Sequence, residues 1–524
     1  MSCRRPLSVI LLSLSLTSTA AAQSTALDEG VALIREGKFD QALVKLEAAR
    51  LNAPRDATIE NLLGITDTQL GQIDEGNNHF RNAIRLNPTL AAPHRNLGFN
   101  FLNAKDFLQA ELELTEASRL DPKDNFAHFY RMQLDLATGR DAEALSQASQ
   151  AGKLVDGDPQ AGVGLIQAEV RLGHPDQAAA KIEKMEQSDQ LPAAAEYSIA
   201  VLLSQHGSYD EAVHCFRRIA KLDPSWDNRY NLALGLLYDG KPDEASILLS
   251  DLHTERPSHA DTLMFLGSAF ELQQKMPEAL QAYRDALADD PSNPDRALDY
   301  TRLLMDLDRY DEAIQAVQSG LQQTASPTAL QLRLGAVEML KGNYDAARDA
   351  FHTALDSDPQ LDLAYVGLAQ TYARQGNDAD AMRTLETARQ KLPGHYPLEY
   401  YFGLVAARTG REKEAVVALE TAARLEPTSA DPLFELGKLY AAQQNWAMAR
   451  QSLERVTQLN PQFAPAHFQL SRIYARLGLT SQAEKEAIRT SSLVNDQRNL
   501  ALARQREQAA SFQPQSSASQ SPQP

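Results

Sequence analysis

Residues Ala260–Asn293, ADTLMFLGSAFELQQKMPEALQAYRDALADDPSN, carry the pattern that decides the fold. Leu263, Leu266 and Phe270 fall on one face at helical spacing, which predicts a first amphipathic helix. A second amphipathic helix is predicted to follow a short turn and to end before Pro291. Two helices of this length cannot bury both of their apolar faces against each other. The unit therefore needs neighbours of its own kind.

The same pattern returns every 34 residues, with a single step of 33, along nearly the whole chain. The predicted repeats start at Gln23, Ala57, Ala91, Asn125, Pro159, Ala193, Trp226, Ala260, Pro294, Thr328, Asp362, Tyr396, Ala430 and Ala464. The twentieth place of each repeat holds alanine, except in the second repeat, where it holds glycine. We expect a small residue there because the two helices cross at that point, and a larger side chain would cost roughly 1–3 kcal/mol by overpacking. The column is Ala42, Gly76, Ala110, Ala144, Ala178, Ala212, Ala245, Ala279, Ala313, Ala347, Ala381, Ala415, Ala449 and Ala483.

Three further columns mark the turns. Glycine at the fifteenth place is expected to end the first helix in the left-handed conformation; it is found at Gly37, Gly71, Gly139, Gly173, Gly207, Gly240, Gly342, Gly376, Gly410 and Gly478. Aspartate three places later is expected to cap the second helix; it is found at Asp40, Asp74, Asp176, Asp210, Asp243, Asp311 and Asp345. Proline near the end of a repeat is expected to separate it from the next; it is found at Pro54, Pro88, Pro122, Pro224, Pro257, Pro291, Pro359, Pro393, Pro427 and Pro461.

A 34-residue helix–turn–helix with Leu-Gly, an aromatic residue, alanine and proline at these places resembles the tetratricopeptide repeat. The resemblance implies an all-α fold, a right-handed superhelical α-solenoid of about 14 repeats, over residues 23–496. It also implies that the first helix of each repeat lines a concave groove, with places 2, 5, 9 and 12 pointing into it.

The two ends of the chain differ from the repeats. Residues 1–22 combine Arg4 and Arg5, an apolar run and Ala20-Ala21-Ala22, which predicts a signal peptide cleaved before Gln23. Residues 497–511 are expected to form a helix that caps the last repeat, because a solenoid needs a polar end. Residues 512–524 are rich in serine, glutamine and proline and are expected to be disordered.

Composition excludes several classes of function. Loss of Arg4 and Arg5 changes the formal charge from −18 to −18 − 2 = −20, which disfavours nucleic acid as a partner. Cleavage also removes Cys3 and leaves Cys215 alone, so no internal disulfide is expected. The apolar leader is too short to span a bilayer, so no integral membrane segment is expected in the mature chain. The chain contains no H-E-x-x-H, C-x-x-C or phosphate-loop motif. We therefore expect a protein that is not an enzyme, with no cofactor and no metal.

What remains as a candidate site is the groove surface. Aromatic residues occupy place 5 of several repeats and place 9 of one, where they could contact an extended peptide or a sugar. The last two complete repeats add a cation at place 9, which makes an aromatic–basic strip on an acidic protein. The alternative is that some of these rings pack between adjacent first helices. The candidate partner-binding residues are Phe434, Lys438, Phe468, Arg472, Tyr400, Tyr230, Phe129 and Phe99.

Polar residues at groove positions near the N-terminus form a second candidate site. By resemblance, some members of the family hold the terminal carboxylate of a peptide with lysine, asparagine and arginine in the groove. Asn61, Arg95 and Asn96 are polar here, but Ile65 and Phe99 stand where that set needs polar residues. The sequence does not support this clamp.

Three functions follow from these observations. The first is an exported scaffold, periplasmic or secreted, that binds a protein or extended peptide along its groove during assembly of the cell envelope. The second is an adaptor in exopolysaccharide export or modification that contacts polysaccharide or its export machinery. The third, a regulator resembling sugar transferases with long repeat arms, lacks the catalytic domain that it would need.

Overall fold

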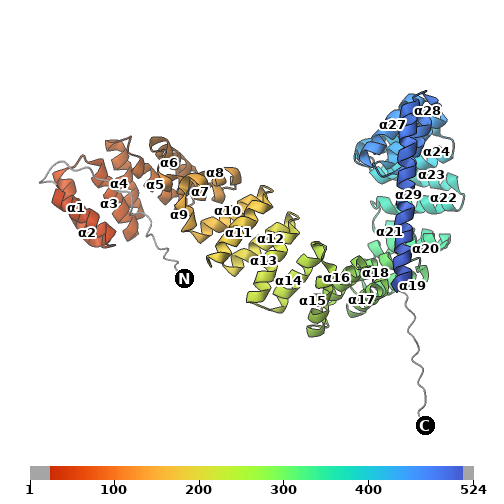
Figure 1. The fold of residues 1–524 in the computed structure, drawn as a ribbon, viewed down its shortest axis with the longest axis horizontal. Helices are drawn as coiled ribbons and strands as arrows, with labels where there is room; N and C mark the ends of the chain where they lie inside the picture. The colour runs from red at the N-terminus through yellow and green to blue at the C-terminus, as the bar shows by residue number, and fades with distance from the viewer. Residues whose placement is uncertain (1–23, 512–524) are drawn as a thin grey trace, which may run out of the picture. The chain divides into compact units, whose positions relative to one another are not determined.

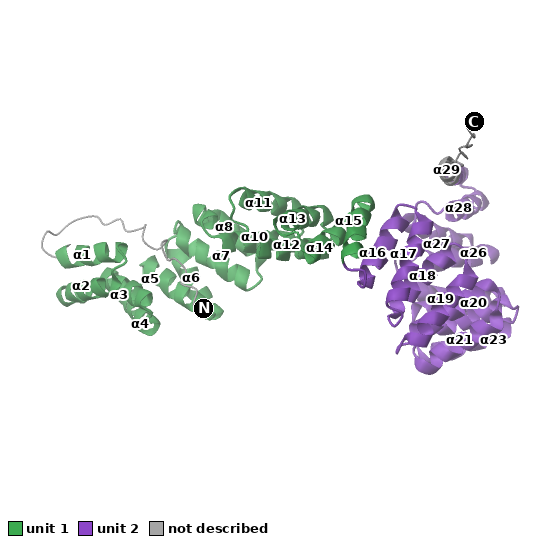
Figure 2. Cartoon of the chain, turned by 90° about the horizontal axis from the view of Figure 1, so that it is seen from below, with its two compact units in different colours: residues 1–255 green, residues 256–524 purple. Residues whose placement is uncertain are grey.

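The computed structural model describes residues 24–511, and these residues form helices joined by short turns, with no strand among them. The chain divides into two compact units, Met1–Glu255 (unit 1) and Arg256–Pro524 (unit 2), which Figure 2 colours separately. The predicted signal peptide, residues 1–22, and the predicted tail, residues 512–524, lie outside the described residues. Both stay predictions.

Unit 1 is built from helix pairs that follow one another along the chain (Figure 1). Its first helices are α1 (Ser24–Arg35), α3 (Ala57–Leu70), α5 (Ala91–Asn103), α7 (Asn125–Ala137), α10 (Pro159–Arg171), α12 (Ala193–Gln205) and α14 (Trp226–Tyr238). Its second helices are α2 (Phe39–Asn52), α4 (Ile73–Leu86), α6 (Phe107–Leu120), α8 (Asp141–Ala151), α11 (Pro175–Gln187), α13 (Tyr209–Leu222) and α15 (Pro242–Glu255). A single extra turn of helix, α9 (Lys153–Asp156), follows the short α8.

Unit 2 repeats the arrangement. Its first helices are α16 (Ala260–Leu272), α18 (Pro294–Asp306), α20 (Thr328–Lys341), α22 (Asp362–Arg374), α24 (Tyr396–Arg408), α26 (Asp431–Ala442) and α28 (Ala464–Arg476). Its second helices are α17 (Met276–Asp289), α19 (Tyr310–Gln323), α21 (Tyr344–Ser357), α23 (Asp378–Lys391), α25 (Glu412–Leu425), α27 (Trp446–Leu459) and α29 (Thr480–Ser511). From Ala57 onward, every predicted repeat start is the first residue of a helix, apart from Ala430, which directly precedes α26. The α-solenoid predicted from the sequence is confirmed.

The last helix is longer than the sequence suggested. Residues 497–511 do not form a separate helix but continue α29. Whether this extension covers the last repeat stays a prediction, because the side chains that would make the contact are not described.

The core of each repeat lies where its two helices cross. From Ala42 to Ala449, every alanine of the twentieth place is fully buried, as expected for a position that admits only a small side chain. The glycine of the second repeat has its own reason. A Cβ on Gly76 would lie 2.6 Å from Thr68 Oγ1 and 2.9 Å from Gly64 O, so alanine does not fit there without movement. The expected small column is confirmed over this range.

The turn between the two helices of a repeat has the same backbone form throughout. All ten glycines of the fifteenth place have positive φ, between 71° at Gly37 and 93° at Gly342. The four repeats without glycine adopt the same conformation with a larger residue, at Lys105, Gln274, Asp308 and Gln444, with φ of 56° to 61°. The turn therefore dictates the left-handed conformation, and glycine follows from it.

The capping role expected for aspartate is wrong. The second helices begin one residue before these aspartates: α13 starts at Tyr209, so Asp210 lies in its first turn and Ser208 holds the cap position. The carboxylate of Asp210 instead pairs with a residue of the next repeat. Its Oδ1 lies 2.9 Å from Nζ of Lys241, in the turn between α14 and α15. A negative charge in the first turn of a helix also interacts favourably with the helix dipole.

None of the helices in the described part of the chain is long and apolar enough to cross a membrane.

Candidate functional site

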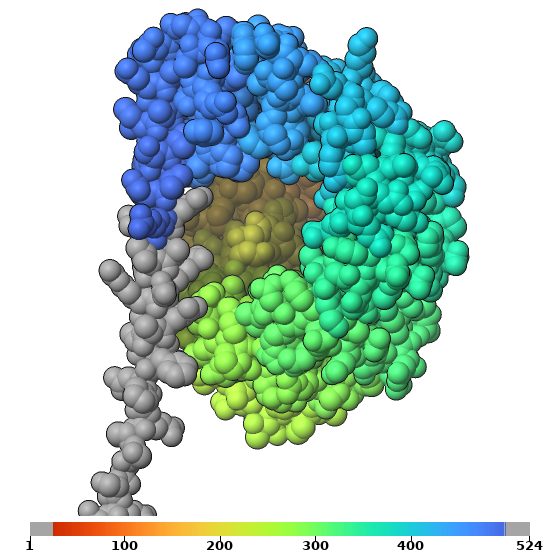
Figure 3. Space-filling view, turned by 90° about the vertical axis from the view of Figure 1, so that its right-hand side faces the viewer, coloured from red at the N-terminus to blue at the C-terminus, as the bar shows by residue number. Residues whose placement is uncertain are grey.

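The first helices lie on the inside of the curve in each unit. Many successive first helices pack directly against one another, as α3 does with α5 in unit 1 and α24 with α26 in unit 2. Most second helices pack against the first helices on either side of them, as α13 does with α12 and α14. Closer spacing on the side of the first helices bends the array toward them. Figure 3 shows the repeats of unit 2 curving around an open hollow.

The predicted C-terminal strip consists of two similar pairs on neighbouring first helices, α26 and α28. Lys438 Nζ lies 5.5 Å from the ring centroid of Phe434, and Arg472 Cζ lies 5.8 Å from that of Phe468. Spacing of four residues places each cation one turn beyond its ring on the same helix face. Both cations are exposed, so this face contacts solvent. We define Phe434, Lys438, Phe468 and Arg472 as the C-terminal strip.

The two rings of the strip differ in how much surface they offer. Phe434 is half-buried and contacts Phe463 edge to face, with 5.0 Å between ring centroids. Phe468 is 50% exposed. A ring exposed to this extent beside a cation can cover an apolar group of a ligand and still place charge next to it.

Tyr400 extends the aromatic surface onto α24. It stacks on Tyr396 with 5.9 Å between centroids and meets Tyr401 edge to face at 5.2 Å. Burial, with the carboxylate of Asp431 nearby, raises the pKa of Tyr400 above its usual range, so its hydroxyl stays protonated. Tyr400 is half-buried and packs beside Phe434 in one apolar cluster, so it supports the strip more than it faces solvent.

The predicted aromatic residues of unit 1 take part in packing. Phe129 is only 8% exposed, and Phe99 packs on Tyr130 with 4.6 Å between ring centroids. Tyr230 is half-buried and stacks on Trp226 at 4.8 Å. These contacts correspond to the packing alternative that the sequence left open, and we leave these three residues out of the site.

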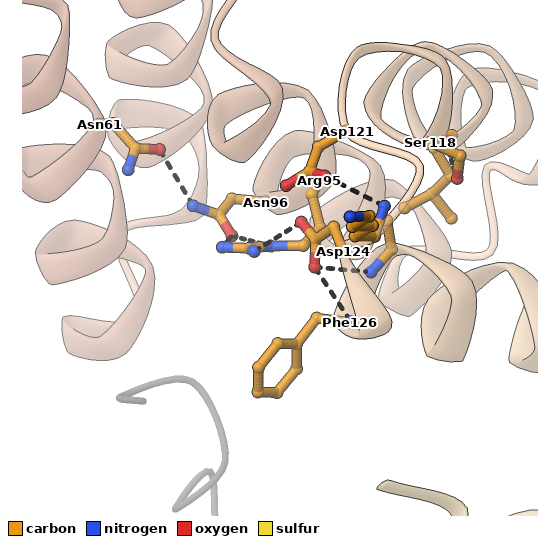
Figure 4. A network of polar contacts seen from close by, with 10 residues as sticks. Asn61, Arg95, Asn96, Ser118, Asp121, Asp124 and Phe126 are labelled. Atoms are coloured by element: carbon orange, nitrogen blue, oxygen red, sulfur yellow. Dashed lines mark hydrogen bonds and ion pairs between the residues drawn. The ribbon is translucent and has the colours of Figure 1, made fainter. Parts of the chain in front are cut away.

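The polar residues near the N-terminus bind one another. Asn96 Nδ2 donates to Asn61 Oδ1 at 3.0 Å, which joins α5 to α3 (Figure 4). Arg95 Nη1 lies 2.8 Å from Asp124 Oδ2, and its guanidinium also lies over the ring of Phe126. Asn61, Arg95 and Asn96 are all buried.

This network explains why no carboxylate clamp forms there. Asp124, at the start of α7, supplies the carboxylate that a ligand would otherwise bring to Arg95. Sequence reasoning did not find the pair, because the two residues lie 29 positions apart in different repeats. The opposite charges of Arg95 and Asp124 and their places in the 34-residue repeat are the features of the sequence that could have indicated the pair.

The free cysteine of the described residues, Cys215, is buried. Burial raises the pKa of the Cys215 thiol far above its usual range, and the carboxylates of Glu196 and Glu186 add to the effect. Within residues 24–511, no group of histidine, cysteine, aspartate and glutamate has an arrangement that would hold a metal ion.

Comparison with known families agrees with this geometry. Models of the tetratricopeptide repeat match residues 163–225, 230–294, 271–334, 338–408 and 434–491, which together exceed half of the chain. The chain belongs to the tetratricopeptide-repeat family. Proteins built from this repeat act typically as non-catalytic scaffolds that bind protein partners.

Individual relatives resemble only parts of this repeat protein. It is 33% identical over 138 residues to cellulose synthase 1 operon protein C of Komagataeibacter xylinus, a match that covers 24% of this chain and 10% of that protein. It is 29% identical over 182 residues to type IV pilus assembly protein PilF of Pseudomonas aeruginosa, which covers 33% of this chain and 72% of PilF. A solved tetratricopeptide repeat protein from Parabacteroides merdae is 18% identical, with a TM-score of 0.36, and the match covers 45% of this chain and 93% of that one. These likenesses concern the repeat fold.

Proposed function

We propose that this tetratricopeptide-repeat protein is an exported, non-enzymatic scaffold that binds an extended peptide segment of a partner protein at the C-terminal strip. The observation that carries the proposal is the exposed pair formed by Phe468 and Arg472, repeated one repeat earlier by Phe434 and Lys438. Aromatic and arginine side chains are the residues that contribute most to binding at protein interfaces. Export rests on the predicted signal peptide, residues 1–22.

A partner in assembly of the cell envelope fits this proposal. An exported scaffold would meet its partners in the periplasm or outside the cell. The likeness to a protein named for pilus assembly supports such a role without identifying the partner.

The test is a double charge reversal, Lys438→Glu with Arg472→Glu, in the full chain. Capture of the partner from an envelope extract should be lost. Helical circular dichroism and the melting temperature should change little, because both side chains are exposed. A matched control is Arg383→Glu with Lys413→Glu on the second helices α23 and α25. It makes the same change in net charge at exposed positions outside the strip. Capture that survives the first variant, or is lost equally in both, would count against the strip.

The second candidate is an adaptor that contacts polysaccharide. Two observations favour it: the half-exposed ring of Phe468, which a sugar ring could cover, and the likeness to a protein of a cellulose synthase operon. A glycan array run with the purified chain separates the candidates. Retention of a glycan that is lost in Phe468→Ala would favour this second function over the first.

A further inference from the structure

The two cation–aromatic pairs of the strip have different charged neighbours. Lys438 Nζ lies 2.7 Å from Glu435 Oε2 and 3.0 Å from Glu435 Oε1, so an acidic side chain of its own helix occupies this cation. In the repeat that follows, Gln469 stands at the place equivalent to Glu435. Arg472 has no carboxylate partner within the described residues. The two pairs look alike in sequence, but only the second offers an unneutralised charge.

The free charge continues along the same helix. Arg476 lies one turn beyond Arg472 on α28, and it is also exposed and without a carboxylate partner in the described part of the chain. Residues 464–524 carry 7 basic and 4 acidic side chains, a formal charge of 7 − 4 = +3. The remaining residues carry 44 basic and 65 acidic side chains, a charge of 44 − 65 = −21. Within the last repeat itself, residues 464–496, 4 basic and 3 acidic side chains give a charge of 4 − 3 = +1, on a chain that is otherwise acidic.

The geometry points to a specific division of roles within the strip: we propose that Arg472, with Arg476 beside it, binds a carboxylate of the partner peptide, while Glu435 prevents Lys438 from doing so. The inference rests on the proposed function and names the ligand's chemistry. The ligand is an extended peptide segment with an acidic residue next to an aromatic or aliphatic one. Its apolar side chain covers Phe468 and Phe434, and its acidic group lies at the last repeat.

The chemistry of the arginine supports this role. A guanidinium group above an aromatic ring keeps the N–H groups in its own plane free to donate, and these match the two oxygens of a carboxylate. A carboxylate brought to Lys438 would instead meet the negative charge of Glu435 within the same exposed pair. Repulsion between two carboxylates disfavours an acidic ligand at Lys438, and such repulsion contributes to specificity as attractive contacts do.

Two reciprocal substitutions test the division of roles. Gln469→Glu gives Arg472 an acidic neighbour like the one that Lys438 has in Glu435. Glu435→Gln gives Lys438 the neighbour that Arg472 has. Each exchange replaces one half-buried side chain by another of nearly the same size, so the fold should be unaffected. Matching melting temperatures of the two variants and the native chain check this.

The probe is a random peptide library displayed to the full chain, followed by affinity measurement with the enriched peptides. Enriched sequences should contain aspartate or glutamate beside an aromatic or aliphatic residue. The affinity of such a peptide should fall in Gln469→Glu by about two- to fivefold, the size expected for an exposed ion pair, and rise by a similar factor in Glu435→Gln. Both changes should become smaller as the salt concentration rises.

The outcomes separate this inference from the function on which it rests. Enriched peptides without acidic residues, or affinities that neither variant changes, would overturn the division of roles and leave peptide binding intact. A library without any enrichment would overturn both. Binding of oligogalacturonate, used as an anionic glycan probe, in place of every peptide would also overturn the inference and would favour the polysaccharide candidate.

Discussion

The ring of Tyr283 in α17 packs directly on the backbone of Gly267 in α16, so close that a Cβ on the glycine would lie 2.8 Å from Tyr283 Cε1. Equivalent pairs recur along the chain, with Phe80 over Gly64 and Leu453 over Gly437. The large side chain of the second helix thus fills the space that the missing side chain of the first helix leaves. This contact fixes how closely the two helices of a repeat approach.

Gly267→Ala should therefore destabilise its repeat. The Tyr283 ring must move to accommodate the new methyl group, at a cost of roughly 1–3 kcal/mol for overpacking. Urea unfolding followed by circular dichroism measures the loss. Gln281→Ala, at an exposed position of α17, is the control and should lie within about 0.5 kcal/mol of the native chain. Equal stability of native chain and Gly267→Ala would show that the close approach is not needed.

Ala279→Leu or Ala381→Leu should have an effect of similar size, because both alanines are fully buried where the helices of their repeat cross. We expect a loss of roughly 1–3 kcal/mol. The loss should be local, since each repeat of a solenoid contacts only its neighbours. Hydrogen exchange resolved along the chain should show faster exchange in the altered repeat and those next to it. Uniform loosening of the whole chain would contradict a solenoid.

Gln274→Gly should stabilise the chain. Gln274 has φ of 60°, a conformation that costs a residue with a side chain roughly 1–2 kcal/mol, whereas glycine adopts it freely. After subtraction of the greater flexibility of glycine in the unfolded chain, the gain should be about 0.5–1 kcal/mol. Gln274→Ala keeps the Cβ and should give little or none of this gain.

Replacing a glycine of the same turn by alanine tests the backbone requirement in the opposite direction. Gly240→Ala puts a Cβ where nothing lies within 4 Å, so any loss of stability comes from the backbone alone. A loss of about 1 kcal/mol is expected. If Gly240→Ala proved neutral, the left-handed turn would not explain the glycine column.

Stability should depend on pH through Glu196. Burial raises the pKa of this fully buried carboxyl from 4.5 to about 7, with Glu186 adding to the shift and Arg218 opposing it. The folded chain then holds a proton that the unfolded chain releases. This contribution to stability is complete below about pH 4.5 and is lost as the pH rises through about 7.

Glu196→Gln removes this titration and tests its sign. Melting temperatures of native chain and variant, measured from about pH 5 to about pH 8, should diverge in favour of the variant as the pH rises. Glu186, on α11, and Arg218, on α13, stay in place as the charged groups around the site. A difference that stays constant over this range would mean that Glu196 does not titrate there.

The repeat frame could be predicted from sequence because every repeat buries the same places. Ala279 is an example, since it is fully buried where two helices cross and a larger side chain does not fit there. The cap assigned to Asp210 failed because a single residue decides whether a side chain precedes a helix or lies within its first turn, and composition does not resolve that difference. The fate of Phe129 and the pairing of Arg95 with Asp124 depend on how adjacent repeats meet. One sequence with a tolerant repeat does not specify those contacts.

Photo-crosslinking tests whether a partner binds at the C-terminal strip on the inner face of unit 2. Full chains carry a photoreactive phenylalanine in place of Phe468 on α28, or of Val417 on the second helix α25, which is 60% exposed and serves as the control. The chains are incubated with envelope extract and irradiated. A crosslinked partner is expected at position 468, in smaller amount when Arg472→Glu is added, with little crosslinking at position 417. A partner that crosslinks at position 417 and not at position 468 would contradict it.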